Sequence, residues 1–199
     1  MTSYKSQLIN LLKQISFVFV LYFVCRWLFY FFNHSQFQDI SAGELIRLSF
    51  YGLRFDAFSI AATNALYILL CALPFRFYYS KPYQFIISLI FIITNGFALA
   101  LNFIDFAYYP FIQKRTTFDV GNLIFGGQSE ITKLIPHFIA DFWYVILLYI
   151  LMLAVLIKVH LNIKKSDKPA FINFSFKSAG IYLITFLLIS GSTLLAIRG

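Results

Sequence analysis

Basic and acidic side chains gather at the ends of two apolar segments and in the loop that follows them. Guanidinium and ammonium groups donate charge-assisted hydrogen bonds to phosphate oxygens, so a cluster of this kind can bind a phosphate. Amide and hydroxyl side chains beside them would supply further hydrogen bonds. The pattern predicts a lipid-headgroup site made of Arg54, Asp56, Asn102, Asp105, Tyr109, Lys114 and Arg115.

A second interpretation of the same residues stays open. Basic side chains at a membrane edge also contact bulk lipid or pair with nearby carboxylates, without forming a binding site. The two interpretations differ in the geometry they require. The site requires Arg54 or Asp56 to lie within ion-pair or single-water reach of Asp105 or of the Lys114–Arg115 pair.

Patterns typical of catalysis or metal binding are missing from the sequence. The three histidines, His34, His137 and His160, fall in different loops or on different sides of the predicted topology. None has an acid or a cysteine at metal-ligand spacing. The Gly126–Gly127 segment lacks the Gly-Lys-Ser/Thr element of a phosphate-binding loop. We therefore predict no catalytic residue, no metal site and no cofactor within this chain.

Five long apolar segments must position the candidate site. A helix needs about 20 apolar residues to cross a bilayer core of about 30 Å, and each segment approaches that length. Hydrophobic residues make up 60% of the chain and charged residues 12%, whereas a soluble domain has about 25% charged residues. We predict an all-α, polytopic membrane protein with five transmembrane helices plus short interfacial helices. The predicted spans are 15–32, 57–73, 83–104, 142–159 and 179–197.

Polar residues near these spans refine the layout. Ser41 and Glu44 form a capping-box pattern, which predicts an interfacial helix that leads into the second span. Arg26, near the end of the first span, is expected to extend to the membrane interface. The short loop 74–82 makes the second and third spans antiparallel neighbours. A polar row in the third span is expected to face protein rather than lipid: Ser88, Asn95, Asn102 and Asp105.

The distribution of charge predicts the orientation. The N-terminal tail and the loops 74–82 and 158–177 carry nine bases and one acid, whereas the other segments carry seven bases and seven acids. Lys and Arg are retained on the cytoplasmic side during insertion. The N-terminus is therefore predicted inside and the C-terminus outside. The net charge of +8 is then a topological signal, and its spread over three segments argues against nucleic acid as a partner.

Three short motifs resemble a known family. Residues 51–56 read YGLRFD and lead into the second span, residues 102–109 read NFIDFAYY and close the third, and KRTT follows at 114–117. The last span ends in AIRG at 196–199. Together with the five spans, these motifs resemble the N-terminal membrane domain of the lipoteichoic acid synthase and phosphoglycerol transferase family, of the Bacteroidetes type. The resemblance covers essentially the whole chain.

This resemblance implies a domain of the bacterial cytoplasmic (inner) membrane that anchors a transferase and presents a lipid headgroup. The implied partners are membrane lipid, such as phosphatidylglycerol, and the enzyme's own extracytoplasmic domain. In that family the fifth span is followed by a domain that resembles alkaline phosphatases and sulfatases, with a threonine nucleophile and a divalent metal, usually manganese. We expect that domain to follow Gly199, and this chain alone to be catalytically inactive.

Two further alternatives stay open. Phosphoethanolamine transferases also have five spans and a related outer domain, although the YGLRFD segment fits the first family better. The chain could instead be a self-sufficient small membrane protein, such as a transporter or an accessory subunit. An acid in the middle of the membrane would favour ion transport. All acids here fall at span ends or in loops, which weakens that alternative.

Overall fold

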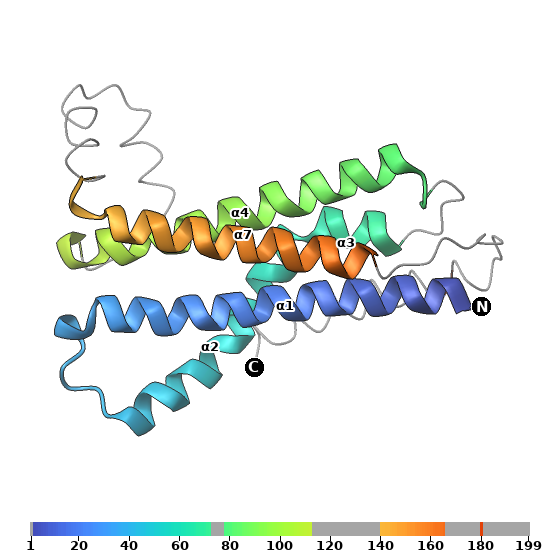
Figure 1. The fold of residues 1–199 in the computed structure, drawn as a ribbon. Coiled ribbons are helices and arrows are strands. Elements are labelled where there is room, and N and C mark those ends of the chain that lie inside the picture. Colours follow the sequence, from blue (N-terminus) through green and yellow to red (C-terminus); the bar gives the residue numbers. More distant parts are fainter. Residues whose placement is uncertain (1, 73–77, 113–139, 166–179, 181–199) are drawn as a thin grey trace.

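The computed structural model describes residues 2–72, 78–112, 140–165 and 180. Three long helices, α1 (Thr2–Phe32), α4 (Lys81–Ile112) and α7 (Trp143–Lys165), run lengthwise and contact one another (Figure 1). After the short 3-10 helix η1 (His34–Gln36), α2 (Ala42–Thr63) runs at an angle to α1, and α3 (Ala65–Ala72) packs against α1 and α4. The described part contains no strand, so the predicted all-α class is confirmed there.

Among the described residues, three helical segments are long and apolar enough to cross a membrane: Ser6–Phe32, Lys81–Pro110 and Trp143–Lys165. Helices α2 and α3 supply a fourth if the pair is one broken span. The predicted fifth span, 179–197, lies outside the described residues except for Gly180. A multi-helical membrane fold is therefore supported, whereas the number five stays a prediction.

The bundle is apolar outside and partly polar inside. On α4, Phe85 and Phe97 leave 68% and 66% of their surface exposed, whereas Asn95, two residues before Phe97, is fully buried. In water this arrangement would be unfavourable, because it exposes large apolar side chains and buries amides. Surrounded by lipid it is favourable, because the amides find partners only inside the protein. The predicted protein-facing row is confirmed for Ser88, Asn95 and Asp105, which are all buried.

Helix α1 begins earlier than the apolar segment predicts. It starts at Thr2 rather than near residue 15. Gln7, Asn10 and Gln14 lie three and four residues apart, on one face of this extension, and all three are buried. The predicted N-terminal tail is thus part of the bundle, because Gln7 and Gln14 find hydrogen-bond partners on α3. A hydropathy window misses such a segment, since its buried face is polar.

The predicted second span is not one straight helix. The Ser41–Glu44 capping box is present, with the Ser41 amide donating to Glu44 Oε2 at 3.1 Å and the Glu44 amide donating to Ser41 Oγ at 3.3 Å. The helix that it starts continues past residue 57 to Thr63, without a separate interfacial helix. The chain then bends by 64° into α3. The segment predicted as the second span, 57–73, is therefore divided between α2 and α3, and whether the pair forms one broken span stays a prediction.

Side chains at the bend give its physical cause. Thr63 Oγ1 donates to the carbonyl of Ser59 at 2.8 Å, and Asn64 Nδ2 donates to the carbonyl of Ile60 at 3.0 Å. Side chains that bond back to the preceding turn compete with the backbone ladder and bend helices. Asn64 itself adopts φ −95° and ψ 8°, outside the α-helical region.

Two further helix ends differ from the predicted spans. Helix α4 continues to Ile112, past Pro110, and α7 continues to Lys165. His160, predicted in a loop, is consequently inside α7, only 1% exposed, with its ring stacked on Phe91 at a centroid distance of 4.5 Å. In α7 the apolar run ends before the helix does, and the contacts of His160 with Phe91 and of Lys164 with Gln84 stabilise the remaining turns.

Candidate functional site

An ion pair joins α1 to α2 near the end of α1. Arg26 Nη2 lies 2.7 Å from Asp56 Oδ1, and the two side chains are only 23% and 14% exposed. The same nitrogen donates to the backbone carbonyl of Gly52 at 3.0 Å. One guanidinium thus binds two groups that lie one turn apart on α2. In a membrane such a pair stabilises each charge, because neither is left without a partner in an apolar medium.

Gly52 makes this close approach possible. A Cβ atom at this position would lie 1.1 Å from Arg26 Nη1 and 2.0 Å from Cζ. No side chain can be accommodated there unless the guanidinium moves away. Gly52 and Asp56 are i and i+4 neighbours on one helix face and together form a cradle for Arg26. The geometry gives a structural reason for the glycine and the aspartate of the YGLRFD segment.

A cleft of about 400 Å³ opens beside the ion pair. Its size falls in the range of about 300–1,000 Å³ that is typical of small-ligand sites. Apolar residues line part of it, and three helices supply its polar groups. These are Tyr22 and Arg26 of α1, Asp56, Ser59 and Thr63 of α2, and Asn102 and Asp105 of α4.

Three of the seven predicted site residues meet in this cleft: Asp56, Asn102 and Asp105. They come from α2 and α4, which contain parts of the two spans that the short 74–82 loop was expected to place together. Asp105 is buried, and Asn102 is half-buried, with its amide donating to the Ala98 carbonyl at 2.9 Å.

Two other predicted residues, Arg54 and Tyr109, are not among the described residues that line it. Arg54 is exposed on α2, with its guanidinium 4.8 Å from the ring centroid of Phe55, which does line the cleft. Tyr109 packs in an aromatic cluster, 4.9 Å from the ring centroid of Phe29 and 5.6 Å from that of Phe37. Lys114 and Arg115 lie outside the described residues.

The described lining differs from the predicted phosphate cradle. Its charged groups are one guanidinium, already paired with Asp56, and two carboxylates. Carboxylate and amide oxygens accept hydrogen bonds, so this lining suits a ligand that carries hydroxyl or ammonium donors. A phosphate would need additional bases, and Lys114 and Arg115 are the bases that the sequence places next along the chain.

Sequence reasoning missed Arg26 as a site residue. It was expected to extend to the membrane interface, whereas its guanidinium turns inward to Asp56 and Gly52. The expected base for Asp56 was Arg54 or the Lys114–Arg115 pair, and the base that the structure shows is Arg26. A signal existed, because α1 and α2 are joined by a short connection and Arg26 is the base of α1 nearest to it.

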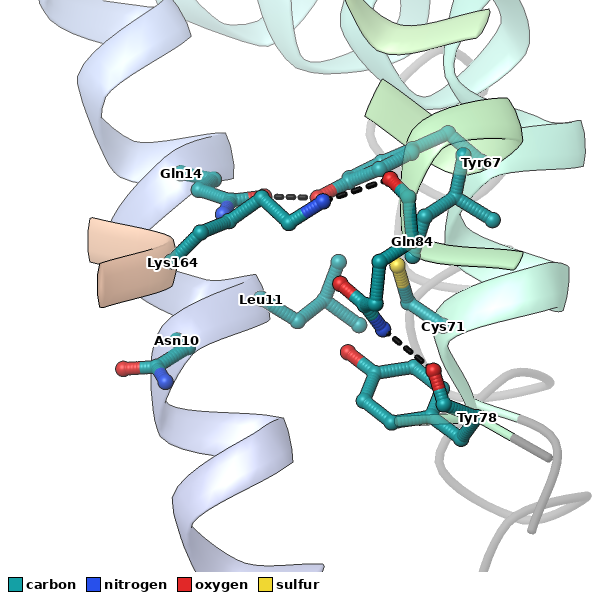
Figure 2. A pocket seen from close by; sticks show the side chains of 9 residues that line it. Asn10, Leu11, Gln14, Tyr67, Cys71, Tyr78, Gln84 and Lys164 are labelled. Carbon is teal, nitrogen blue, oxygen red and sulfur yellow. Dashed lines mark hydrogen bonds between the residues drawn. The ribbon is translucent and has the colours of Figure 1, made fainter. Parts of the chain in front are cut away.

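A second polar cluster, also missed, lies near the N-terminal end of the bundle (Figure 2). Gln14 accepts a hydrogen bond from the Tyr67 hydroxyl, and Gln7 donates to the Cys71 carbonyl. Lys164 Nζ of α7 donates to the Gln84 carbonyl of α4 at 2.6 Å. These bonds join α1 to α3 and α7 to α4. The cavity among them measures about 10 Å³, space for one water molecule at most.

Within the described ranges, no three His, Cys, Asp or Glu side chains are close enough to hold a metal ion. Both cysteines, Cys25 and Cys71, are buried and do not form a disulfide with each other. Comparison with family models, curated proteins and solved structures found no match to this chain. The likeness to lipoteichoic acid synthases therefore rests on the sequence motifs alone.

Proposed function

We propose that this chain is the membrane-anchoring, headgroup-presenting domain of a phosphoglycerol transferase of the lipoteichoic acid synthase type. The observation that carries the proposal is the cleft beside the Arg26–Asp56 pair. It joins a ligand-sized volume to polar groups from three helices, within a bundle whose outer surface is apolar.

The chemistry of the lining supports a lipid headgroup with hydroxyl donors. Asp105, Asn102 and Ser59 offer acceptor oxygens, and a glycerol headgroup has two hydroxyls that could donate to them. A choline headgroup has no such donor. An ethanolamine headgroup has an ammonium donor, which keeps the phosphoethanolamine alternative chemically reasonable.

The proposal includes a topology. With Lys5, Lys13 and the bases of 74–82 and 158–177 inside, the cleft end of the bundle faces outward in the bacterial cytoplasmic membrane. A catalytic domain after Gly199 would then lie on the same side as the cleft. Its divalent metal, manganese in the resembled family, would be held by that domain and not by this chain.

Lipid selectivity of the purified full chain tests the proposal. Native mass spectrometry from detergent micelles would compare retention of dihexanoylphosphatidylglycerol and dihexanoylphosphatidylcholine. We expect a preference for phosphatidylglycerol, and its loss in Asn102→Leu and Asp105→Asn. Asp39→Asn is the matched control, because this exposed residue of the loop before α2 also loses one charge but lies outside the cleft. Equal retention of the two lipids by the wild-type chain would refute the proposal.

A self-sufficient transporter is the second candidate, and the polar row of α4 is the observation that favours it. The Asn64–Asn95 contact and the stacked Phe91 and His160 rings lie between the two cavities described above. These side chains bind one another, so within the described residues the polar row does not form a continuous path. This interruption weakens the transporter candidate. The reading frame after Gly199 separates the two candidates, since only the first requires a sulfatase-like domain there.

A further inference from the structure

Two buried asparagines bind each other at the bend between α2 and α3. Asn64 Nδ2 donates to Asn95 Oδ1 at 3.1 Å, and Asn95 Nδ2 donates to Asn64 Oδ1 at 2.7 Å. Both side chains are fully buried. Two reciprocal amide bonds between fully buried side chains fix the separation and the relative rotation of the two helices, because any slip leaves amide groups without partners.

The asparagine pair is also anchored within its own helices. Asn64 Nδ2 donates to the Ile60 carbonyl at 3.0 Å, and Asn95 Nδ2 donates to the Phe91 carbonyl at 2.8 Å. On each side the amide is thus tied both to its own backbone and to the facing helix. The bend in α2–α3 and the contact with α4 form one hydrogen-bonded unit.

This unit lies at the inner end of the cleft. Thr63, which lines the cleft, accepts a hydrogen bond from Asn64 Nδ2 at 3.3 Å and donates one to Ser59, another lining residue. On α4, the lining residues Ala98 and Asn102 follow Asn95 by three and seven positions, on the same helix face. Both walls of the cleft therefore begin at the asparagine pair.

We infer that the Asn64–Asn95 bridge is the positioning element that holds the α2 wall against the α4 wall and so sets the width of the cleft. The inference deepens the proposed function, since it assigns residues that control the headgroup site without touching the headgroup. It predicts that loss of the bridge alters cleft geometry even where the fold remains stable.

Paired substitutions separate positioning from simple stabilisation. Asn64→Leu or Asn95→Leu alone leaves one buried amide without its partner and destabilises the bundle. Asn64→Leu combined with Asn95→Leu removes both amides and is expected to recover most of that loss. If the bridge only stabilises the fold, the double variant should recover lipid selectivity together with stability. If the bridge positions the two walls, the double variant should be folded but should lack the preference for phosphatidylglycerol.

The width of the cleft can be measured directly. Spin labels at Phe58→Cys on α2 and Ile104→Cys on α4, both exposed positions, report the distance between the walls. The labels require a background in which Cys25 and Cys71 are replaced by alanine. We expect the distance distribution to broaden or shift in the double variant. Asn95→Leu alone provides the same readout if the double variant does not fold.

Asn33→Leu is the matched control. Asn33 is another buried asparagine, which donates to the Phe29 and Phe106 carbonyls at 3.0 and 3.4 Å but does not contact the bend. The Asn33→Leu variant should reduce the stability of the bundle without changing the distance between the two spin labels. An unchanged distance in the asparagine-pair variants, or an equal change in Asn33→Leu, would overturn the inference. Absence of lipid selectivity in the wild type would refute the proposed function, while the distances would still decide the role of the bridge.

Discussion

Replacing Gly52 by alanine tests the contact on which the ion pair depends. The new Cβ atom would lie 1.1 Å from Arg26 Nη1, whereas ordinary contacts begin near 3.4 Å. The guanidinium must retreat by about 2 Å to reach that separation. Because the group is planar and rigid, Nη2 moves with it. Its contacts with Asp56 at 2.7 Å and with the Gly52 carbonyl at 3.0 Å are then lost together.

The size of the effect follows from the burial of the pair. Breaking a fully buried pair costs about 3–5 kcal/mol, whereas an exposed pair contributes about 0–1 kcal/mol. With side chains 23% and 14% exposed, this pair falls between those limits, and we take about 2 kcal/mol. Alanine stabilises a helix interior by about 1 kcal/mol relative to glycine, so the net destabilisation expected for Gly52→Ala is about 1 kcal/mol.

Gly43→Ala provides the matched comparison within the same helix. Nothing lies within 4 Å of a Cβ atom at Gly43, so this variant should be neutral or more stable. The assay is SDS-induced unfolding of the purified chain in mixed micelles, followed by circular dichroism. The two glycine variants should differ by up to about 2 kcal/mol in free energy of unfolding.

Two results would refute this reasoning. Equal stability of Gly52→Ala and Gly43→Ala would mean that Arg26 does not occupy the space above Gly52. The second test uses an Arg26→Met background, in which the guanidinium is gone and its contacts with α2 are already lost. In that background, Gly52→Ala should lower the free energy of unfolding by less than it does in the wild type. An equal loss of stability in the two backgrounds would mean that the Arg26 contact does not cause it.

Further predictions concern topology, activity and the second polar cluster. A reporter enzyme fused after Gly199 should be active only outside the cytoplasm, and cytoplasmic activity would refute the orientation. The purified chain in phosphatidylglycerol vesicles should release no diacylglycerol, with or without manganese, and metal-dependent release would reveal a site that the sequence patterns missed. Tyr67→Phe should lower the free energy of unfolding by about 1 kcal/mol, because Gln14 loses a buried partner. The exposed Tyr51→Phe should change it by less than about 0.5 kcal/mol, so equal effects would argue against the Gln14–Tyr67 bond.

Part of the candidate site could be derived before any coordinates. A short loop between two apolar segments forces antiparallel packing, so Asp56 and Asp105 had to lie near the same end of the bundle. The seven-residue spacing of Asn95 and Asn102 had to put both on one face of α4. These are consequences of connectivity and helix periodicity.

The partner of Asp56 could not be derived in the same way. From the sequence alone, Arg26, Arg54 and the bases of the loop after α4 could each have reached Asp56. The choice depends on the rotation of α1 against α2, and the close approach at Gly52 fixes that rotation. Such a contact joins residues 26 positions apart, and no local pattern encodes it.

The sequence by itself determined the class of this protein. Apolar segments of membrane-spanning length make helices, because a lipid environment requires every backbone hydrogen bond to be satisfied within the segment. It also determined the capping box at Ser41 and the inward-facing row of α4. The tertiary structure decided where the second span bends and which base meets Asp56. It also made the Gln7, Asn10 and Gln14 face part of the core. Asp56, Gln7, Gln14 and Asn64 are polar groups whose partners lie on another helix, and only the packed bundle fixes which partner is within reach.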